Sequence, residues 1–463
     1  MPVLKRLFSH YIAEEARPML ALAAPIVLAE LGWMGMSIVD TMMVGRQANS
    51  AVAIGAVSLG TMLYYSVAIL GTGLMLGLDT LVSHSYGAGN LKDTHRSLVN
   101  GIYLSLAVTP VLMGVVWLWQ ILLGRMDIQR EVLAQAVPYL RALNWSTLPL
   151  LLYFAFRRYL QGIDLVKPVM FSLISANLLN LLGNWMFIYG HFGVHAMGTV
   201  GSGWATCISR AYMAAVLVAY CLYFDPRDRS GLREASRWPH LPRVWQLLGL
   251  GFPVAMQLGL EVGVFAVATV LIGRLGAVEL ASHQIALNTA SVTYMVPLGI
   301  SSAAAVRVGQ ALGRRDPHGA SRAGWTALAF AAGFMSLTAT AFFFAPRMII
   351  RAYTPGAVVI RAATKLLFVA AFFQLFDGFQ VVASGALRGA GDTRTPMICS
   401  ASLYWLVGLP LGYFLCFRLG WGAAGLWTGF CVALIMIGST LVYVWRRKER
   451  SFAAHEAGLP VAS

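Results

Sequence analysis

Charged residues are scarce in this sequence. Asp, Glu, Lys and Arg make up 11% of its 463 residues, whereas hydrophobic residues make up 58%. Because soluble domains are roughly one quarter charged, this balance excludes an ordinary soluble fold. The composition indicates instead a protein that lies within a membrane.

Cysteines are few, and recognisable catalytic motifs are missing. The five cysteines all lie in apolar segments without a CxxC pair, and we expect them to be small buried hydrophobic residues. The sequence has no HExxH, no paired DDxxD, no P-loop and no GxSxG with suitable partners. We therefore expect neither an enzyme nor an ATP-driven pump, and we expect no cofactor.

Acidic residues are also few. The 34 Lys and Arg residues outnumber the 19 Asp and Glu residues and give a net charge of +15. In a soluble protein such an excess would suggest nucleic-acid binding. Here the basic residues are concentrated in loops between apolar runs, as membrane topology requires. No nucleic-acid partner is therefore expected.

Long apolar runs are abundant. At about 1.5 Å of rise per residue, a helical run of roughly 20 residues crosses a hydrocarbon core of about 30 Å. The runs predict helices near residues 19–45, 53–82, 97–123, 132–160, 168–190, 198–223, 244–272, 280–308, 320–345, 358–387, 396–417 and 423–445.

The loops predict the orientation of these helices. An even number of spans places both termini on one side, and that side carries more than twice as many Lys and Arg residues as the other. Because positive residues are retained in the cytoplasm, both termini are predicted to be cytoplasmic, in a bacterial inner (plasma) membrane. No cleavable signal peptide is expected, since Lys5 and Arg6 precede a polar stretch and then a full-length span.

The two halves of the chain resemble each other. APIVLAELGWMGMSIVDTMMVGR at 24–46 aligns with FPVAMQLGLEVGVFAVATVLIGR at 252–274, which pairs Pro25 with Pro253. The same interval separates Pro168 from Pro396. Because each half contains six spans, the two copies share one orientation and form a parallel repeat.

These features predict an all-α membrane protein with about twelve transmembrane helices in two pseudo-symmetric six-helix lobes around a central cavity. The longest polar stretch, 225–243, is the expected cytoplasmic linker between the lobes. The other predicted domains are an N-terminal lobe at 1–224, a C-terminal lobe at 244–447 and a cytoplasmic tail at 448–463.

Acidic residues within the predicted spans are the first candidates for function. They are Glu30, Asp40, Glu261 and Asp377, with Asp79 near the inner end of the second helix. A charge at the bilayer centre costs roughly 2.5–3.5 kcal/mol on insertion scales, so such residues usually face a cavity. There they could be protonated, ionise when the protein rearranges, or bind a small cation. The alternative is a neutral carboxyl packed against a donor between helices.

The repeat duplicates the scaffold but not these acids. At the interval that pairs the prolines, the positions matched to Asp40, Glu261 and Asp377 hold Ala268, Trp33 and Pro149. A purely structural acid would be expected in both copies, so the unequal placement suggests that the lobes have specialised.

Asn177, Asn180 and Asn184 form a polar stripe, because spacings of three and four place them on one helical face. Amide oxygens can coordinate a monovalent cation, and amides can hydrogen bond to a carboxylate. The alternative is hydrogen bonding between helices, which is common in membranes. An ion-binding role is favoured if Asp40 lies nearby in the same lobe.

Six short motifs are distributed along the chain, in both halves. They are VDTMMVGR at 39–46, SHSYGAGN at 83–90, NLLGNWMFIYG at 180–190, ELASHQIALN at 279–288, VGQALGRRD at 308–316 and ALRGAGDTRTP at 386–396. On these motifs the chain resembles the multidrug and toxic compound extrusion (MATE) transporters of the bacterial NorM-like branch, over residues 17–447. The resemblance implies antiport of cationic, amphipathic compounds against Na⁺ or H⁺.

The resemblance also implies roles for individual residues. Those expected to couple cation or proton movement are Asp40, Asn180, Asn184, Thr206, Glu261 and Asp377. The first four match the amino-terminal lobe and could hold Na⁺, and the three acids would line the substrate cavity. Phe373, one turn before Asp377, stands where NorM-like members often carry a tyrosine, so a hydroxyl ligand is lost from the second lobe.

The leading hypothesis is therefore a secondary active exporter of small cationic drugs, expected to work as a monomer among membrane lipids. The alternative is a flippase for a lipid-linked precursor. A flippase would need a strongly basic cavity to hold pyrophosphate, whereas the charges expected well inside the membrane are acidic apart from Arg210.

Overall fold

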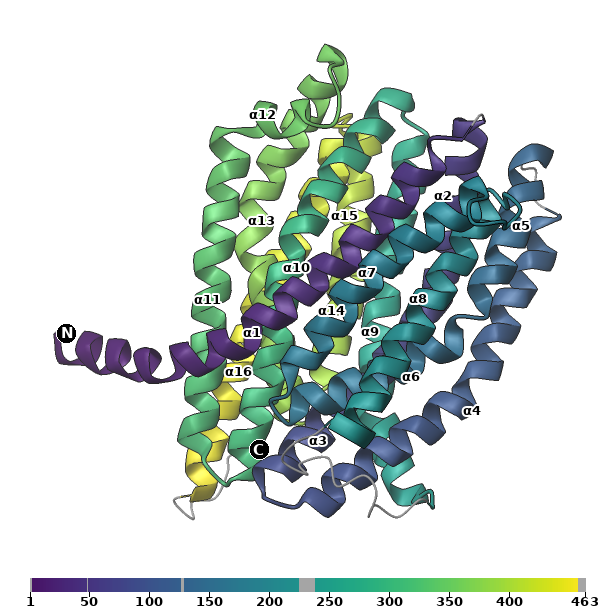
Figure 1. Cartoon of the computed structure of the whole chain (residues 1–463). Helices are drawn as coiled ribbons and strands as arrows, with labels where there is room; N and C mark the ends of the chain where they lie inside the picture. The colour runs from purple at the N-terminus through teal and green to yellow at the C-terminus, as the bar shows by residue number, and fades with distance from the viewer. Residues whose placement is uncertain (1, 48, 126–128, 225–237, 457–463) are drawn as a thin grey trace. The chain divides into compact units, whose positions relative to one another are not determined.

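The computed structural model describes residues 2–47, 49–125, 129–224 and 238–456, and within these ranges every regular element is helical (Figure 1). The α-helices are α1 (Pro2–Val44), α2 (Ser50–Met75), α3 (Gly77–Gly87), α4 (Leu91–Leu123), α5 (Arg130–Asn144), α6 (Thr147–Gly162), α7 (Val166–Tyr189), α8 (Thr199–Ala219), α9 (Leu241–Gly273), α10 (Ala277–Gly313), α11 (Pro317–Phe344), α12 (Pro346–Arg351), α13 (Ala357–Gly389), α14 (Arg394–Ser402), α15 (Leu409–Tyr413) and α16 (Ala423–Glu456). π-helical turns extend α8 over Tyr220–Phe224 and join α14 and α15 into one continuous span.

Eleven helical segments in the described ranges are long and apolar enough to cross a membrane. They coincide with eleven of the twelve predicted spans. The remaining prediction, 132–160, is divided at Trp145–Ser146 into α5 and α6, which have 15 and 16 residues. Each is shorter than the roughly 20 residues of a typical span, so the twelfth predicted span stays a prediction.

Side-chain caps explain why some helices begin before the apolar runs do. At the start of α4, Asn90 Oδ1 accepts a hydrogen bond from the Asp93 amide (3.1 Å). At the start of α11, Asp316 Oδ1 accepts one from the Gly319 amide (2.7 Å). These bonds satisfy amides of the first turn that have no partner within the helix, so the helices start ahead of the predicted positions.

The described structure comprises two compact units. The described residues within 28–255 form the first unit, and those within 256–463 together with those within 1–27 form the second unit. Much of the predicted linker, 225–237, and the end of the predicted tail, 457–463, lie outside the described residues. The predicted domain boundaries therefore remain a prediction.

Within the first unit, glycines allow α9 to cross the junction of α2 and α3 at close range. A β-carbon on Gly251 would overlap the Leu74 carbonyl oxygen, and one on Gly73 would lie 2.5 Å from Ala255 Cα. Only glycine permits backbones to approach this closely, which is a common way of packing helices in membranes.

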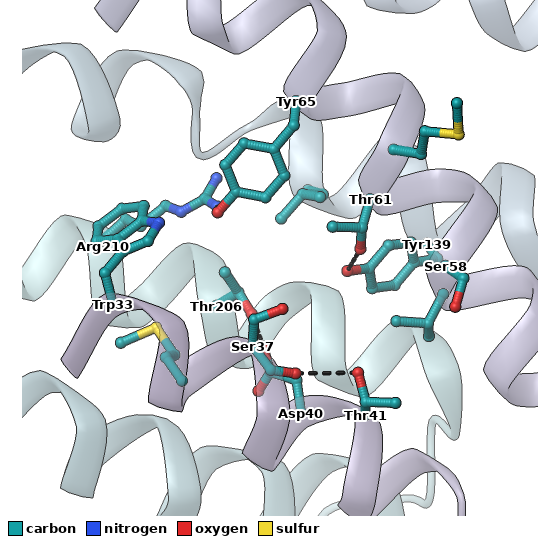
Figure 2. A pocket seen from close by; sticks show the side chains of 14 residues that line it. Trp33, Ser37, Asp40, Thr41, Ser58, Thr61, Tyr65, Tyr139, Thr206 and Arg210 are labelled. Atoms are coloured by element: carbon teal, nitrogen blue, oxygen red, sulfur yellow. Dashed lines mark hydrogen bonds between the residues drawn. The ribbon is translucent and has the colours of Figure 1, made fainter. Parts of the chain in front are cut away.

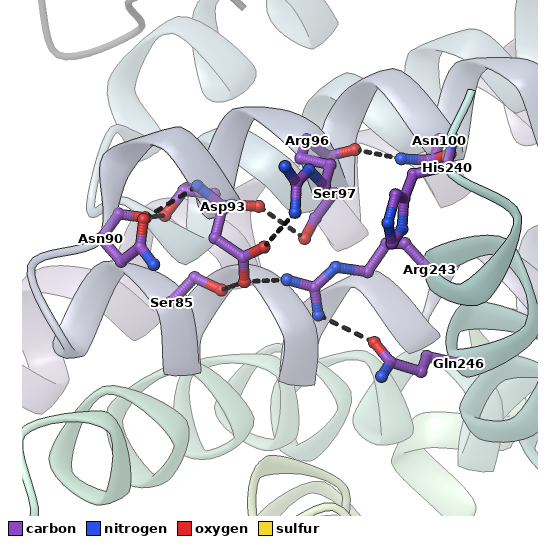
Figure 3. Close-up of polar contacts among 10 residues, drawn as sticks. Ser85, Asn90, Asp93, Arg96, Ser97, Asn100, His240, Arg243 and Gln246 are labelled. Atoms are coloured by element: carbon purple, nitrogen blue, oxygen red, sulfur yellow. Dashed lines mark hydrogen bonds and ion pairs between the residues drawn. The ribbon is translucent and has the colours of Figure 1, made fainter. Parts of the chain in front are cut away.

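Polar contacts also attach the start of α9 to α4 (Figure 3). Asp93 accepts hydrogen bonds from the Arg243 guanidinium and from the Ser85 hydroxyl, the latter at 2.9 Å. The His240 amide donates to Asn100 Oδ1 (2.8 Å). These bonds anchor the last residues of the predicted linker, 225–243, to α3 and α4 of the first unit.

In the second unit, α13 packs against α10, α11 and α16. The amino-terminal part of α1 also belongs to this unit. There Glu15 accepts two hydrogen bonds from Arg307, from Nε at 2.6 Å and from Nη2 at 2.9 Å. This paired geometry fixes both orientation and distance, and it holds the start of α1 against α10.

Candidate functional site

Asp40 projects from α1 and is buried against α7 and α8 in the first unit. Asn184 Nδ2 donates to Asp40 Oδ1 (2.5 Å), and Thr206 Oγ1 donates to Asp40 Oδ2 (3.1 Å). Asn184 Nδ2 also donates to Asn180 Oδ1 (3.1 Å). The structure thus brings together the four residues expected to form the amino-terminal lobe site.

The register of α7 determines which asparagines reach the acid. Asn180 and Asn184 are one turn apart and both are buried. Asn177, one turn earlier on the same stripe, is only half-buried and donates to the Leu173 carbonyl of its own helix (3.0 Å). The polar stripe therefore contributes two of its three members to the site.

The polar atoms around Asp40 suit both an ionised carboxylate and a small cation. Among the described residues, Asn184 Oδ1 is buried and has no hydrogen-bond partner. Buried polar atoms are nearly always paired, so an unpaired acceptor marks a place where a ligand or a proton could be held. With the Asp40 carboxylate and the Thr206 hydroxyl, it provides the oxygen donors that a hard monovalent cation prefers.

A cavity of about 290 Å³ opens beside Asp40 within the first unit (Figure 2). Its wall carries three aromatic rings, those of Trp33, Tyr65 and Tyr139, and two charged residues, Asp40 and Arg210. The other lining residues are Met36, Ser37, Thr41, Val57, Ser58, Thr61, Met62, Leu143 and Thr206. A mixed aromatic and polar wall of this kind can hold an amphipathic molecule.

Arg210 is buried on α8, and neutral groups hold its charge. Nη1 donates to Ser146 Oγ (2.6 Å), and Nη2 donates to the Tyr65 hydroxyl (3.0 Å). Its guanidinium carbon lies 5.0 Å from the ring centroid of Tyr64 and 5.7 Å from that of Trp33. Aromatic faces stabilise cations at these distances, and in the described part of the chain no carboxylate forms an ion pair with Arg210.

A second group of polar residues surrounds Glu261 in the second unit. Glu261 Oε1 accepts hydrogen bonds from Gln257 Nε2 (3.1 Å) and Gln380 Nε2 (2.9 Å). The Tyr404 hydroxyl donates to Gln380 Oε1 (3.1 Å) and so fixes the orientation of this amide. The carboxylate is therefore placed by residues from α9, α13 and the π-helical turn after α14.

Asp377 belongs to the same group, on α13 one turn before Gln380. It is half-buried, and it lies on the face of α13 that carries Gln380, the amide that donates to Glu261. Phe373, a further turn back, stacks on Trp427 with 5.9 Å between ring centroids. The expected carboxyl-terminal lobe acids are thus brought together, and the position of the missing tyrosine is apolar.

The other acids in the spans of the first unit have basic partners. Glu30 forms an ion pair with Arg157, and Asp79 lies 3.7 Å from Arg158. All four residues are buried. Glu30 and Asp79 therefore have basic partners, which Asp40 lacks among the described residues.

Some residues around the acids could have been found from helical spacing. Gln257 precedes Glu261 by four residues and Gln380 follows Asp377 by three, so each lies on the face of its acid. No comparable signal marks Trp33 or Tyr139, because aromatic residues occur throughout the apolar helices.

Taken together, the spans and the two similar halves define a multi-pass membrane protein built from a duplicated helical lobe. The MatE family model matches the chain twice, over residues 25–186 and again over 253–414. The matches begin at Pro25 and Pro253, the prolines that the repeat pairs, which confirms the repeat. The chain belongs to the MatE family.

Curated relatives are similar over nearly their whole length. The chain is 37% identical over 444 residues to the probable multidrug resistance protein NorM of Mesorhizobium japonicum, covering 94% of this chain and 95% of the relative. It is 33% identical over 457 residues to the multidrug resistance protein NorM of Vibrio vulnificus, covering 97% and 100%. It is 36% identical over 442 residues to the multidrug resistance protein MdtK of Yersinia pseudotuberculosis, covering 94% and 96%.

Solved structures share the fold. The eukaryotic MATE transporter AtDTX14 matches with a TM-score of 0.86 at 20% identity, covering 96% of this chain and 99% of that one. A multidrug resistance MATE family transporter in an outward-facing conformation matches with a TM-score of 0.83 at 18% identity, covering 94% and 96%. These likenesses confirm the predicted all-α, two-lobed membrane fold.

Proposed function

We propose that this protein is a secondary active multidrug efflux transporter that exports cationic amphipathic compounds by antiport with Na⁺ or H⁺. The observation that carries the proposal is the position of Asp40, an acid without a basic ion-pair partner among the described residues, in the wall of a partly aromatic cavity. Relatives named as multidrug resistance proteins support the same function.

Asp40 can serve both the drug and the coupling ion. As a carboxylate it attracts an organic cation into the cavity, where the faces of Trp33, Tyr65 and Tyr139 add cation–π attraction. When a proton or Na⁺ neutralises the carboxylate, that attraction is lost and the drug is released. The free oxygen of Asn184 is available to a bound Na⁺ or to the hydrogen of a protonated Asp40.

The ion drives export only if its affinity differs between inward-open and outward-open states. Drug enters from the cytoplasm or inner leaflet, and the ion enters from outside at Asp40 or at the Glu261 and Asp377 pair. One positive charge moving inward releases about 2.3 kcal/mol per 100 mV of membrane potential. A monovalent cationic drug moving outward costs the same amount, so a one-for-one exchange is driven by the concentration gradient of the ion. The potential contributes when more positive charge enters than leaves. We place the protein in the inner membrane with both termini cytoplasmic.

A flippase for a lipid-linked precursor is the less favoured alternative. Pyrophosphate needs several basic groups, whereas Arg210 is the one basic residue among the described residues that line the cavity, and Asp40 shares the wall with it.

The test is transport in liposomes. We expect the purified protein to move ethidium when either a Na⁺ or a proton gradient is imposed, and the effective gradient identifies the ion. Ethidium movement that neither gradient accelerates would contradict antiport.

Three neutral variants then identify which lobe carries the acid that couples transport to the ion. Asp40→Asn, Glu261→Gln and Asp377→Asn each remove one carboxylate, and at least one should abolish gradient-driven transport. Glu131→Gln is the control, because Glu131 is an exposed acid in the first turn of α5 outside both acid groups. Normal transport by all three variants would assign the acids a structural role only.

A further inference from the structure

We propose that the end of the second unit at which α12 joins α11 to α13 is a binding surface for the headgroups of anionic phospholipids. The surface consists of two pairs of basic residues, and we call it the basic hairpin surface. Its members are Arg347, Arg351, Arg361 and Lys365. The inference does not depend on the proposed function, because this surface lies outside both acid groups.

The sequence around the basic hairpin surface has an unusual charge pattern. Residues 317–376 contain no Asp or Glu but five Lys and Arg residues, and four of these five fall within 347–365. The segment 346–356 connects two spans on the side predicted to face outward. Because Lys and Arg in short loops are normally concentrated on the cytoplasmic side, four of them here without an acid indicate a specific anionic partner.

Helical spacing gathers the four side chains. α12 packs against α11 and α13 and connects them at one end of the second unit (Figure 1). Arg347 and Arg351 are four residues apart on α12, so they share one helical face. Arg361 and Lys365 have the same spacing on α13. All four residues are exposed.

The positive charge of this surface is not compensated within the protein. In the described ranges none of the four residues forms an ion pair. Glu279 lies at the same end of the unit, one turn before Ser282, whose hydroxyl donates to the Val359 carbonyl at the start of α13 (3.4 Å). This carboxylate forms no ion pair with the surface either. The four charges are therefore available to an external anion.

Exposed apolar side chains lie among the basic ones. Phe344 at the end of α11 is 79% exposed, Met348 on α12 is 71% exposed, and Tyr353 just before α13 is exposed as well. The opposite side of α12, with Pro346 and Ile350, is buried. A face that is both apolar and basic suits the boundary of a bilayer, where apolar side chains enter the acyl region while Arg and Lys reach the phosphates.

The apolar side chains also decide between possible anions. Free phosphate or an acidic soluble protein would compensate the charges but would leave an apolar patch in water, which is unfavourable. An anionic phospholipid supplies a phosphate for the guanidinium groups and acyl chains for the apolar residues. The competing interpretation is a solvated basic surface without any preference among lipids.

A local probe of lipid composition tests the proposal. Val358 is exposed and lies three residues before Arg361, so Val358→Cys can carry a bimane fluorophore once the five native cysteines are replaced by alanine. The labelled full-length protein is placed in phosphatidylcholine nanodiscs that contain a brominated quencher lipid. The headgroup of this quencher is either phosphatidylglycerol or phosphatidylcholine.

We expect the brominated phosphatidylglycerol to be enriched beside the label. Each basic residue near a membrane surface raises the local affinity for an anionic lipid about fivefold at low salt. The anionic quencher should therefore reach half-maximal quenching at a lipid fraction at least about fivefold lower than the zwitterionic quencher does. High salt should reduce this preference, because it screens exposed charges.

Matched variants assign the preference to this surface. Replacing all four of its residues by Gln should make the two quenchers equally effective. The control replaces four exposed arginines at the other end of the same unit, and it should keep the preference; these are Arg314, Arg315, Arg446 and Arg447. If the fourfold variant does not purify as a folded protein, Arg361→Gln decides the question, and the preference should fall about fivefold.

Several results would overturn the proposal. They are equal quenching by both lipids in the protein with its basic residues intact, a preference that survives the fourfold substitution, and a preference that the control variant loses to the same extent. Inorganic phosphate that abolishes the preference at an ionic strength where NaCl does not would assign the surface to a free anion instead. None of these results bears on drug export, which the ethidium assay measures separately.

Discussion

The Asp40 carboxylate receives a hydrogen bond at each oxygen, and one of the donors can be removed with little change of shape. Thr206→Val replaces the hydroxyl by a methyl group, and hydrogen bonds to charged groups contribute about 1.5–3 kcal/mol. If Na⁺ is the coupling ion, the variant loses a ligand, and the Na⁺ concentration for half-maximal transport should rise about tenfold.

If the proton is the coupling ion, the ionised carboxylate loses a donor, and half-maximal transport should need a lower proton concentration. The half-maximal Na⁺ concentration and the half-maximal proton concentration are each measured by titrating transport in liposomes with that ion. Thr206→Ser keeps the hydroxyl and should behave like the wild type. A Thr206→Val protein with both titrations unchanged would show that the bond to Asp40 has no part in coupling.

The buried pair of Glu30 and Arg157 predicts a large effect on stability. Glu30→Gln leaves the Arg157 guanidinium charged and unpaired, which should lower the free energy of unfolding by about 3–5 kcal/mol. The double variant Glu30→Gln/Arg157→Gln should be less destabilised than the sum of the two single variants. Thermal unfolding in detergent measures these differences, with the exposed Glu131→Gln as control, and purely additive losses would contradict the pairing.

At the residue scale, the sequence predicted the acids better than their partners. Asp40, Glu261 and Asp377 could be identified because a carboxyl in a long apolar run is conspicuous. The partner of Glu30 could not, since Arg157 lies 127 residues away along the chain. Arg157 and Arg158 are neighbours on α6, and they pair with different acids. Helix packing decides this pairing, and no local sequence pattern encodes it.

At the scale of helices, the close crossing of α9 over the α2 and α3 junction gives a sharp prediction. Gly251→Ala places a β-carbon against the Leu74 carbonyl oxygen, so the helices must separate. Overpacking of this kind typically costs about 1–3 kcal/mol, and the melting temperature should fall.

A neighbouring glycine provides the matched control. Gly249 lies in the same helix, and a β-carbon there meets nothing within 4 Å. Gly249→Ala should be neutral or stabilising by up to about 1 kcal/mol, because alanine favours the helix. Equal melting temperatures for the two variants would contradict the close approach.

Span positions followed from apolar length, but the break between α5 and α6 did not. Pro149 lies four residues after Trp145 and has no N–H to donate to the Trp145 carbonyl, which interrupts the helix at this point. In addition, the Ser146 and Thr147 hydroxyls donate to the carbonyls of Leu143 (2.6 Å) and Asn144 (2.7 Å). Hydroxyls that bond to their own backbone can bend a helix, and here Arg210 also donates to Ser146. The break therefore combines a proline that the sequence shows with a bond from another helix that it does not.

At the scale of the whole molecule, the repeat was visible in the sequence because duplicated prolines and turns keep a constant interval. What differs between the halves is their polar content. Asp40 is held by one amide and one hydroxyl in the first unit, whereas Glu261 is held by two glutamine amides in the second. A shared scaffold with different acid environments is consistent with lobes that divide the work of binding ion and drug.

The orientation in the membrane is the last prediction, and single cysteines test it. Replacing the five native cysteines by alanine gives a background in which Lys92→Cys and His195→Cys are introduced separately at exposed positions. Lys92 lies in the first turn of α4, at an end predicted to be cytoplasmic, and His195 lies in a loop predicted to face outward. In intact spheroplasts a membrane-impermeant maleimide should label only His195→Cys, whereas permeabilised spheroplasts should show labelling of both. This expectation follows from the excess of Lys and Arg in the short loops on one side of the membrane, which is the cytoplasmic side in most membrane proteins. The reverse labelling pattern would contradict the predicted topology. It would also place the entry of the coupling ion on the wrong face for export.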